Sequence, residues 1–237
     1  MKLNNFLIFS FFFFVLISAC NKVKKTDAEI ERDNWIAGFA DSIEYYQQQK
    51  MLIESQLQKI NESIREELQN FELINNPREV TGYYLLKGWK NKIPYKSTGI
   101  YARINQNENL ELIATLAGGT FNKICIGNFC SEIVPHDQAF NYRHEKYNTV
   151  YFTGGKADTI ANYISDFANE KLTLEYVENA QQKNFIIPHD EKEMISKTWK
   201  LFSSQQKVHQ LQKELWMDSR KIDAFRRMMD ANKKTDN

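Results

Sequence analysis

The chain is poor in the residues from which catalytic and metal-binding motifs are usually built. Of its 237 residues, three are cysteine and four are histidine, while glycine and proline number nine and four. A glycine-rich phosphate loop, a nucleophile elbow, a His-Glu-x-x-His motif and a calcium-binding loop are all missing from the sequence. We therefore predict that the protein is not an enzyme and that it needs no cofactor.

An excess of charge of either sign is also missing. Lysine and arginine number 31, aspartate and glutamate 30, and the formal net charge is +1. Such a balance gives no strongly basic surface for phosphate backbones. We expect no nucleic-acid partner.

Long apolar runs are confined to the N-terminus. A short segment carrying Lys2 is followed by Phe6 to Ile17, which is apolar except for Ser10. This run is shorter than the ~20 residues that cross a bilayer as a helix, and it is typical of a signal-peptide core. It ends in Ile17-Ser18-Ala19-Cys20, which resembles the lipobox of bacterial lipoproteins.

The resemblance to bacterial lipoproteins implies cleavage between Ala19 and Cys20 and a lipid on the Cys20 thiol. Residues 1–19 would be the signal peptide and residues 20–27 a flexible tether to a membrane of the cell envelope. Asn21 after the cysteine favours the outer membrane by the family's sorting rules, with the face left open. The alternative is an uncleaved N-terminal anchor with an incidental cysteine.

Proline is absent from residues 28–76, where apolar residues follow a heptad pattern typical of a coiled-coil helix. The a positions are Ile36, Ile43, Lys50, Leu57, Ile64 and Phe71, and the d positions are Phe39, Tyr46, Ile53, Ile60, Glu67 and Ile74. A second helix is predicted within residues 188–237, where Met194, Leu201, Val208, Leu215, Ile222 and Met229 recur every seventh residue.

The similar lengths of the two helices favour an antiparallel coiled-coil hairpin. In the matching register, Lys50 lies opposite Asp218, and such a polar pair in a seam disfavours other registers. The alternative is a parallel oligomer formed by the first helix alone.

Residues 78–187 carry short strand-like runs separated by turn residues, which predicts a small, mainly antiparallel β domain. The runs are Val80–Trp89, Thr98–Asn105, Leu110–Leu116, Lys123–Ile126, Phe129–Val134, Tyr147–Thr153 and Leu172–Val177. We expect these strands to form one sheet, with an amphipathic helix from Asp158 to Asn169 that packs Ile160, Tyr163, Ile164 and Phe167 on it. The predicted fold class is thus α+β, with a coiled-coil hairpin flanking a β domain with one packed helix.

Gly127-Asn128 between two apolar runs predicts a two-residue hairpin turn. Ile126 and Phe129 would close it, and Cys125 and Cys130 would form the next pair, near enough for a disulfide. An exported protein meets an oxidising compartment, so we predict the bridge. The alternatives are two reduced cysteines, a metal site with His136 or His144, and a redox dithiol; we predict no metal site.

Pro-His-Asp occurs twice, at residues 135–137 and 188–190. A His-Asp pair can orient a base or a metal ligand, but each copy also fits a strand end followed by a proline turn, which is the interpretation we adopt.

Aromatic residues gather early in the β domain, where Tyr83, Tyr84 and Trp89 could stack a ligand. Filling of the core by these rings is the alternative. We predict a membrane-anchored structural or protein-interaction module. The alternative function is binding of a glycan or peptide through these aromatics. Its oligomeric state, partner and specific role are left open by the sequence.

Overall fold

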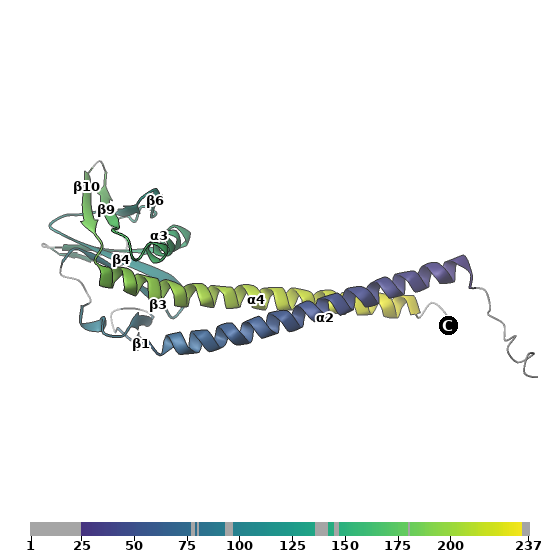
Figure 1. The fold of residues 1–237 in the computed structure, drawn as a ribbon. Helices are drawn as coiled ribbons and strands as arrows, with labels where there is room; N and C mark the ends of the chain where they lie inside the picture. Colours follow the sequence, from purple (N-terminus) through teal and green to yellow (C-terminus); the bar gives the residue numbers. More distant parts are fainter. Residues whose placement is uncertain are drawn as a thin grey trace, which may run out of the picture. The chain divides into compact units, whose positions relative to one another are not determined.

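A computed structural model describes residues 25–76, 79, 81–92, 97–135, 142–144, 147–179 and 181–233. The chain divides into two compact units. One is formed by Leu52–Trp216, and the other by the segments Met1–Met51 and Met217–Asn237. The elements of each unit are labelled in Figure 1.

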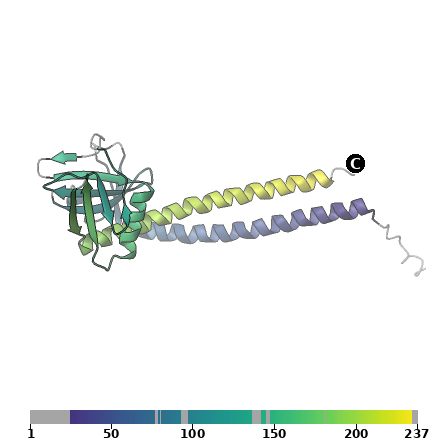
Figure 2. The ribbon, with the colours of Figure 1, turned by 90° about the horizontal axis from the view of Figure 1, so that it is seen from above.

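The larger unit contains two antiparallel sheets, which are drawn from above in Figure 2. The first has the order β1 (Phe71–Ile74), β2 (Tyr83–Leu86), β3 (Gly99–Asn105), β4 (Leu110–Ala117), β8 (Tyr147–Thr153) and β7 (Tyr142–His144). The second has the order β10 (Gln181–Ile186), β9 (Thr173–Glu178), β5 (Lys123–Ile126) and β6 (Phe129–Cys130). A short 3-10 turn, η1, spans Lys90–Lys92.

The core of this unit lies between the two sheets and helix α3 (Gly155–Asp166). Phe121 contacts the rings of both Phe152 on β8 and Tyr176 on β9, so it joins the sheets. Helix α3 packs against β4, β6 and β8 and buries Ile160 and Ile164. Burial of apolar side chains on this scale is the main force that holds such a unit together.

Helix α4 (His189–Lys233) begins at an open edge of β3. Because β2 pairs with β3 only near Ile104, the N–H groups of Ile100 and Ala102 need other acceptors. The Ile100 N–H donates to Glu191 Oε2 at 3.0 Å, and the Ala102 N–H lies 3.4 Å from Met194 Sδ. The first turns of α4 therefore complete the sheet, as the ribbon beside β3 and β4 shows (Figure 1).

The predicted coiled-coil hairpin is wrong. Within α2 (Asp27–Leu68), all of which the structure describes, Ile53 is the only buried residue, whereas a coiled coil needs a continuous packed seam. Met194 and Leu201, which the heptad pattern assigned to the seam of the second helix, lie in the core of the β-rich unit. The first third of α4 therefore packs on a sheet, and its Lys200 also pairs with Glu67 of α2 at 2.8 Å.

The first helix also ends earlier than predicted, at Leu68. Phe71 and Ile74, assigned to the a and d positions, belong to β1 and pair with Leu86 and Tyr83 of β2. Phe71 is buried there, so its apolar side chain serves the sheet core. A heptad match over so few residues cannot tell a helix end from a short strand.

Each predicted strand run contains or overlaps a strand, but β1, β7 and β10 were not predicted and the strands form two sheets where one was expected. The β10 strand is polar and largely exposed, so it lacks the alternation that marks a half-buried strand. Among the helices that the structure describes, none has an apolar stretch long enough to cross a bilayer.

Candidate functional site

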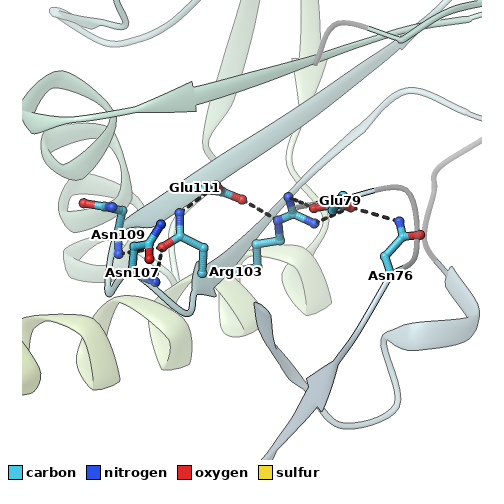
Figure 3. A network of polar contacts seen from close by, with 7 residues as sticks. Asn76, Glu79, Arg103, Asn107, Asn109 and Glu111 are labelled. Atoms are coloured by element: carbon cyan, nitrogen blue, oxygen red, sulfur yellow. Dashed lines mark hydrogen bonds and ion pairs between the residues drawn. The ribbon is translucent and has the colours of Figure 1, made fainter. Parts of the chain in front are cut away.

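A buried arginine forms the centre of a polar network on the first sheet (Figure 3). Arg103 on β3 is 5% exposed. Its Nη1 and Nη2 donate to the two carboxylate oxygens of Glu79 at 3.1 and 2.6 Å, and its Nε donates to Glu111 Oε2 at 2.5 Å. The guanidinium lies 3.9 Å from the ring centroid of Tyr83 and 5.2 Å from that of Tyr151.

The electrostatics of this network keep Arg103 charged. Burial by itself would lower the pKa of the guanidinium, but the hydrogen bond with Glu79 and the negative charges of Glu111 and Glu79 outweigh it and hold the pKa above its ordinary value. Burial raises the pKa of the Tyr101 hydroxyl well above its usual range, so this neighbour stays neutral.

Both carboxylates in the network are further hydrogen-bonded. Asn76 Nδ2 donates to Glu79 Oε1 at 3.0 Å, and Asn105 Nδ2 donates to Glu111 Oε1 at 2.9 Å. The Asn105 side-chain oxygen in turn accepts the N–H groups of Asn107 and Asn109 in the β3–β4 turn (Figure 3). Because the charged groups pair with one another, none of them is left to act on a ligand. The network ties two loops to the sheet, so its role is to stabilise the fold.

The arrangement best suited to binding lies on the surface, at the β5–β6 hairpin. Phe129, Tyr163 and Phe167, which we call the Phe129 cluster, lie in a row with their rings tilted against one another. The ring centroids of Phe129 and Tyr163 are 5.3 Å apart, and those of Tyr163 and Phe167 are 4.7 Å apart. Phe129 and Phe167 remain 40% and 37% exposed. Exposed aromatic rings in contact with one another are unusual on a surface that binds nothing.

Local structure explains why these rings meet. Tyr163 and Phe167 are four residues apart and lie on the same side of a helix, and the Phe167 N–H donates to the Tyr163 carbonyl at 3.1 Å. Gly127 adopts a φ of 55°, which permits the tight turn that precedes Phe129. The turn lies against Tyr163, since a Cβ at Gly127 would be 3.5 Å from the Tyr163 hydroxyl.

A disulfide closes this hairpin. The predicted register is confirmed, with Ile126 paired to Phe129 and Cys125 paired to Cys130. The two Sγ atoms are at bonding distance, 2.12 Å, and the two Cα atoms are 4.1 Å apart. The bridge restrains the strand that carries Phe129.

We expect the bridge to form when the protein is made in an oxidising compartment. Treatment of an unfolded chain that begins at Asn21, and so lacks Cys20, with a thiol reagent should add no mass. After reduction the same treatment should add two reagent groups, which mass spectrometry measures. Replacing Cys125 and Cys130 together with alanine should lower the free energy of unfolding by about 2 kcal/mol, because the closed loop is short. Modification of both thiols without reductant would contradict the prediction.

The other residues predicted for a site are placed as follows. Cys20 lies outside the described residues. Within the part of α2 and α4 that the structure describes, Asp218 pairs with Lys221 of its own helix at 3.0 Å and not with Lys50. The predicted Lys50–Asp218 ion pair is therefore not formed, because the Asp218 carboxylate is paired with a lysine one turn along its own helix.

The aromatic set predicted to stack a ligand is mostly in the core. Tyr83 is buried under the Arg103 guanidinium, and Trp89 is buried with Lys92 Nζ 4.3 Å from its ring centroid. Tyr84 is partly exposed, on the opposite face of the same strand. These rings form no open stacking platform, so the alternative of core packing applies to two of the three.

The histidines lie apart where the structure describes them. His189 is the first residue of α4, and its neighbour Asp190 pairs with Lys92 at 2.9 Å. His209 Nε2 contacts Glu108 at 2.6 Å. His136 lies outside the described residues. Among the described residues, no group of histidine, cysteine and carboxylate side chains is arranged to hold a metal ion.

Sequence reasoning did not identify the Phe129 cluster. It placed Tyr163 and Phe167 on the buried face of a helix, with Ile160 and Ile164, but only the two isoleucines are buried. The sequence signal that could have indicated the cluster is Phe129, which lies between the Gly127-Asn128 turn and the bridged Cys130. Comparison with known proteins adds no relative: no family model, no curated protein and no solved structure matches this chain.

Proposed function

We propose that the protein is an exported lipoprotein, held to a membrane of the cell envelope through lipid on Cys20, which binds another envelope protein through the Phe129 cluster. The outer membrane is the proposed location. The lipobox at residues 17–20 supports the anchor. The partly exposed aromatic rings of the cluster, in contact with one another, are the observation that carries the binding function, and no catalytic role is proposed.

The physical case for binding rests on rigidity. Aromatic side chains dominate the energetic centres of protein interfaces, because they bury a large area with few rotatable bonds. Here a disulfide restrains one ring and a packed helix holds the other two. An ordered surface avoids much of the entropy that binding would otherwise cost. The cluster is thus prepared for contact with an apolar partner surface.

A photo-crosslinking residue tests this proposal in living cells. Placed at Phe129, it should give a discrete adduct with one or a few envelope proteins. The matched control is Ile186 on β10, which is apolar and 54% exposed in the same unit. Phe167→Ala should weaken binding of the captured partner by about 2 kcal/mol, roughly thirtyfold in Kd.

The same cells report on the anchor. Cys20→Ser should abolish labelling by radioactive palmitate and release the protein from the membrane fraction. Equal adduct yields from Phe129 and Ile186, or none from Phe129 in correctly anchored protein, would count against binding through the cluster. If the wild-type protein takes up no palmitate label, the proposed lipid anchor is wrong, while the proposed binding through the Phe129 cluster is not affected.

A second candidate is binding of a glycan, the class of ligand that the sequence left as an alternative. Asn162 and Asp166 come one residue before Tyr163 and Phe167, so they lie on the neighbouring side of the helix, where Asn162 Nδ2 donates to Asp166 Oδ2 at 3.1 Å. Rings next to amide and carboxylate groups suit sugar faces and hydroxyls. Retention on peptidoglycan fragments that is lost in Phe129→Ala, with no protein adduct in cells, would favour this candidate.

A further inference from the structure

The smaller unit has an unusual surface near the start of α2. Ile30, Trp35 and Met228 are exposed, and Trp35 is 60% exposed although its ring contacts Phe39 at a centroid distance of 5.7 Å. An uncovered tryptophan beside other apolar groups indicates a surface that is covered in use.

This surface is hollowed on both sides of Trp35. A groove of about 470 Å³ is lined by Ala28, Glu31, Arg32, Trp35, Phe39, Met228, Ala231 and Asn232. A second, of about 420 Å³, adds Phe225 and residues one turn further along α2. We call the two together the Trp35 surface. The floor is apolar and its rim carries charged and amide groups.

The charges around it suit phospholipid headgroups. The last turns of α4, from Arg220 to Lys233, hold five basic and two acidic residues. The first turns of α2 are acidic, but Asp33 pairs with Lys25, and Glu29 accepts hydrogen bonds from Thr26. Tryptophan with nearby arginine and lysine is the usual composition of a protein surface that lies in the headgroup region.

The length of chain before α2 places a bilayer within reach. Six residues lie between Cys20 and Asp27, a span of at most about 25 Å between the two Cα atoms, and Trp35 lies about 12 Å further along the helix. A lipid on Cys20 would keep the Trp35 surface continually close to the membrane. The local concentration of lipid would then be high enough for a weak apolar contact to form.

We propose that the Trp35 surface is a second membrane contact, which inserts Trp35 and its apolar neighbours into the interface of the bilayer that carries the lipid anchor. This inference rests on the proposed lipid anchor for its orientation. An apolar contact beside a lipid anchor adds a second interaction with the same bilayer and strengthens membrane binding.

Tryptophan fluorescence tests the contact. The lipidated protein would be reconstituted into vesicles of phosphatidylethanolamine and phosphatidylglycerol with brominated acyl chains. We expect strong quenching of an emission component that Trp35→Phe removes. The matched control is Trp216→Phe, since Trp216 is 59% exposed but lies on a distant turn of α4. Its removal should leave the quenched component intact.

A second measurement separates this inference from the anchor. A chain that begins at Asn21, and so lacks the lipidated cysteine, should bind the same vesicles weakly, and Trp35→Ala should lower its partition coefficient roughly tenfold. Binding of the unlipidated chain would support the contact even if the wild type takes up no palmitate. Unquenched Trp35 in lipidated protein would overturn the inference, and a dimer in sedimentation that shields Trp35 would assign the surface to a second copy instead.

Discussion

Arg103→Ala is expected to lower the free energy of unfolding by about 3 to 5 kcal/mol, enough to unfold many domains of this size. The guanidinium is 5% exposed and makes hydrogen bonds to both Glu79 and Glu111. Its removal leaves two carboxylates in a largely buried site without a positive charge, and that desolvated charge is the main cause of the loss. Urea denaturation followed by circular dichroism measures the change.

Companion variants separate charge from packing. Arg103→Lys keeps the charge but loses the paired hydrogen bonds to Glu79, so an intermediate loss is expected. Adding Glu79→Gln and Glu111→Gln to Arg103→Met removes all three charges and should recover much of the stability. Arg65→Ala, at an exposed arginine on α2, is the control and should change little. If the triple variant is no more stable than Arg103→Ala, the carboxylates are not the cause.

Leu201→Ala should cost about 2 to 5 kcal/mol, because it leaves a cavity in the core of the β-rich unit. Leu201 lies on α4 but is completely buried among the core residues of that unit. The same change at Leu215, two heptads later on the same helix and only partly buried, should cost clearly less. Thermal unfolding of both variants measures the difference.

The two positions occupy the same heptad site, so the comparison tests the role of α4 directly. If α4 served only as one helix of a coiled coil, Leu201→Ala and Leu215→Ala would lower the free energy of unfolding by similar amounts. Equal losses would contradict the assignment of the first third of α4 to the sheet core. A much larger loss at Leu201 would show that this helix holds the β-rich unit together.

Local sequence patterns predicted elements well where one physical signal dominated. The Gly127-Asn128 turn predicted the register of its hairpin, because a two-residue loop leaves little choice of pairing. The alternation of apolar and polar residues, together with the turn residues between runs, predicted the central strands. The polar strand β10 was missed, since its pairing with β9 is made by the backbone and leaves no trace in side-chain hydrophobicity.

Patterns failed where the same periodicity serves two kinds of packing. Met194 and Leu201 repeat every seven residues whether they face a helix or a sheet, and the choice is made by the open edge of β3. The sequence also did not predict the candidate site, for a related reason. Phe129 and Tyr163 are far apart in sequence, so only the packing of α3 on the hairpin brings their rings together.

The sequence by itself determined the short-range features of this protein: most of the helical segments, the central strands and the hairpin of Cys125 and Cys130. The lipobox-like run at residues 17–20 adds a prediction of its location. Each depends on neighbours along the chain. Tertiary structure alone decided that Arg103 is buried between two glutamates, that α4 completes a sheet, and that three separate aromatic residues form one exposed cluster. These depend on contacts between distant segments, whose partners are selected by the packing of the whole unit.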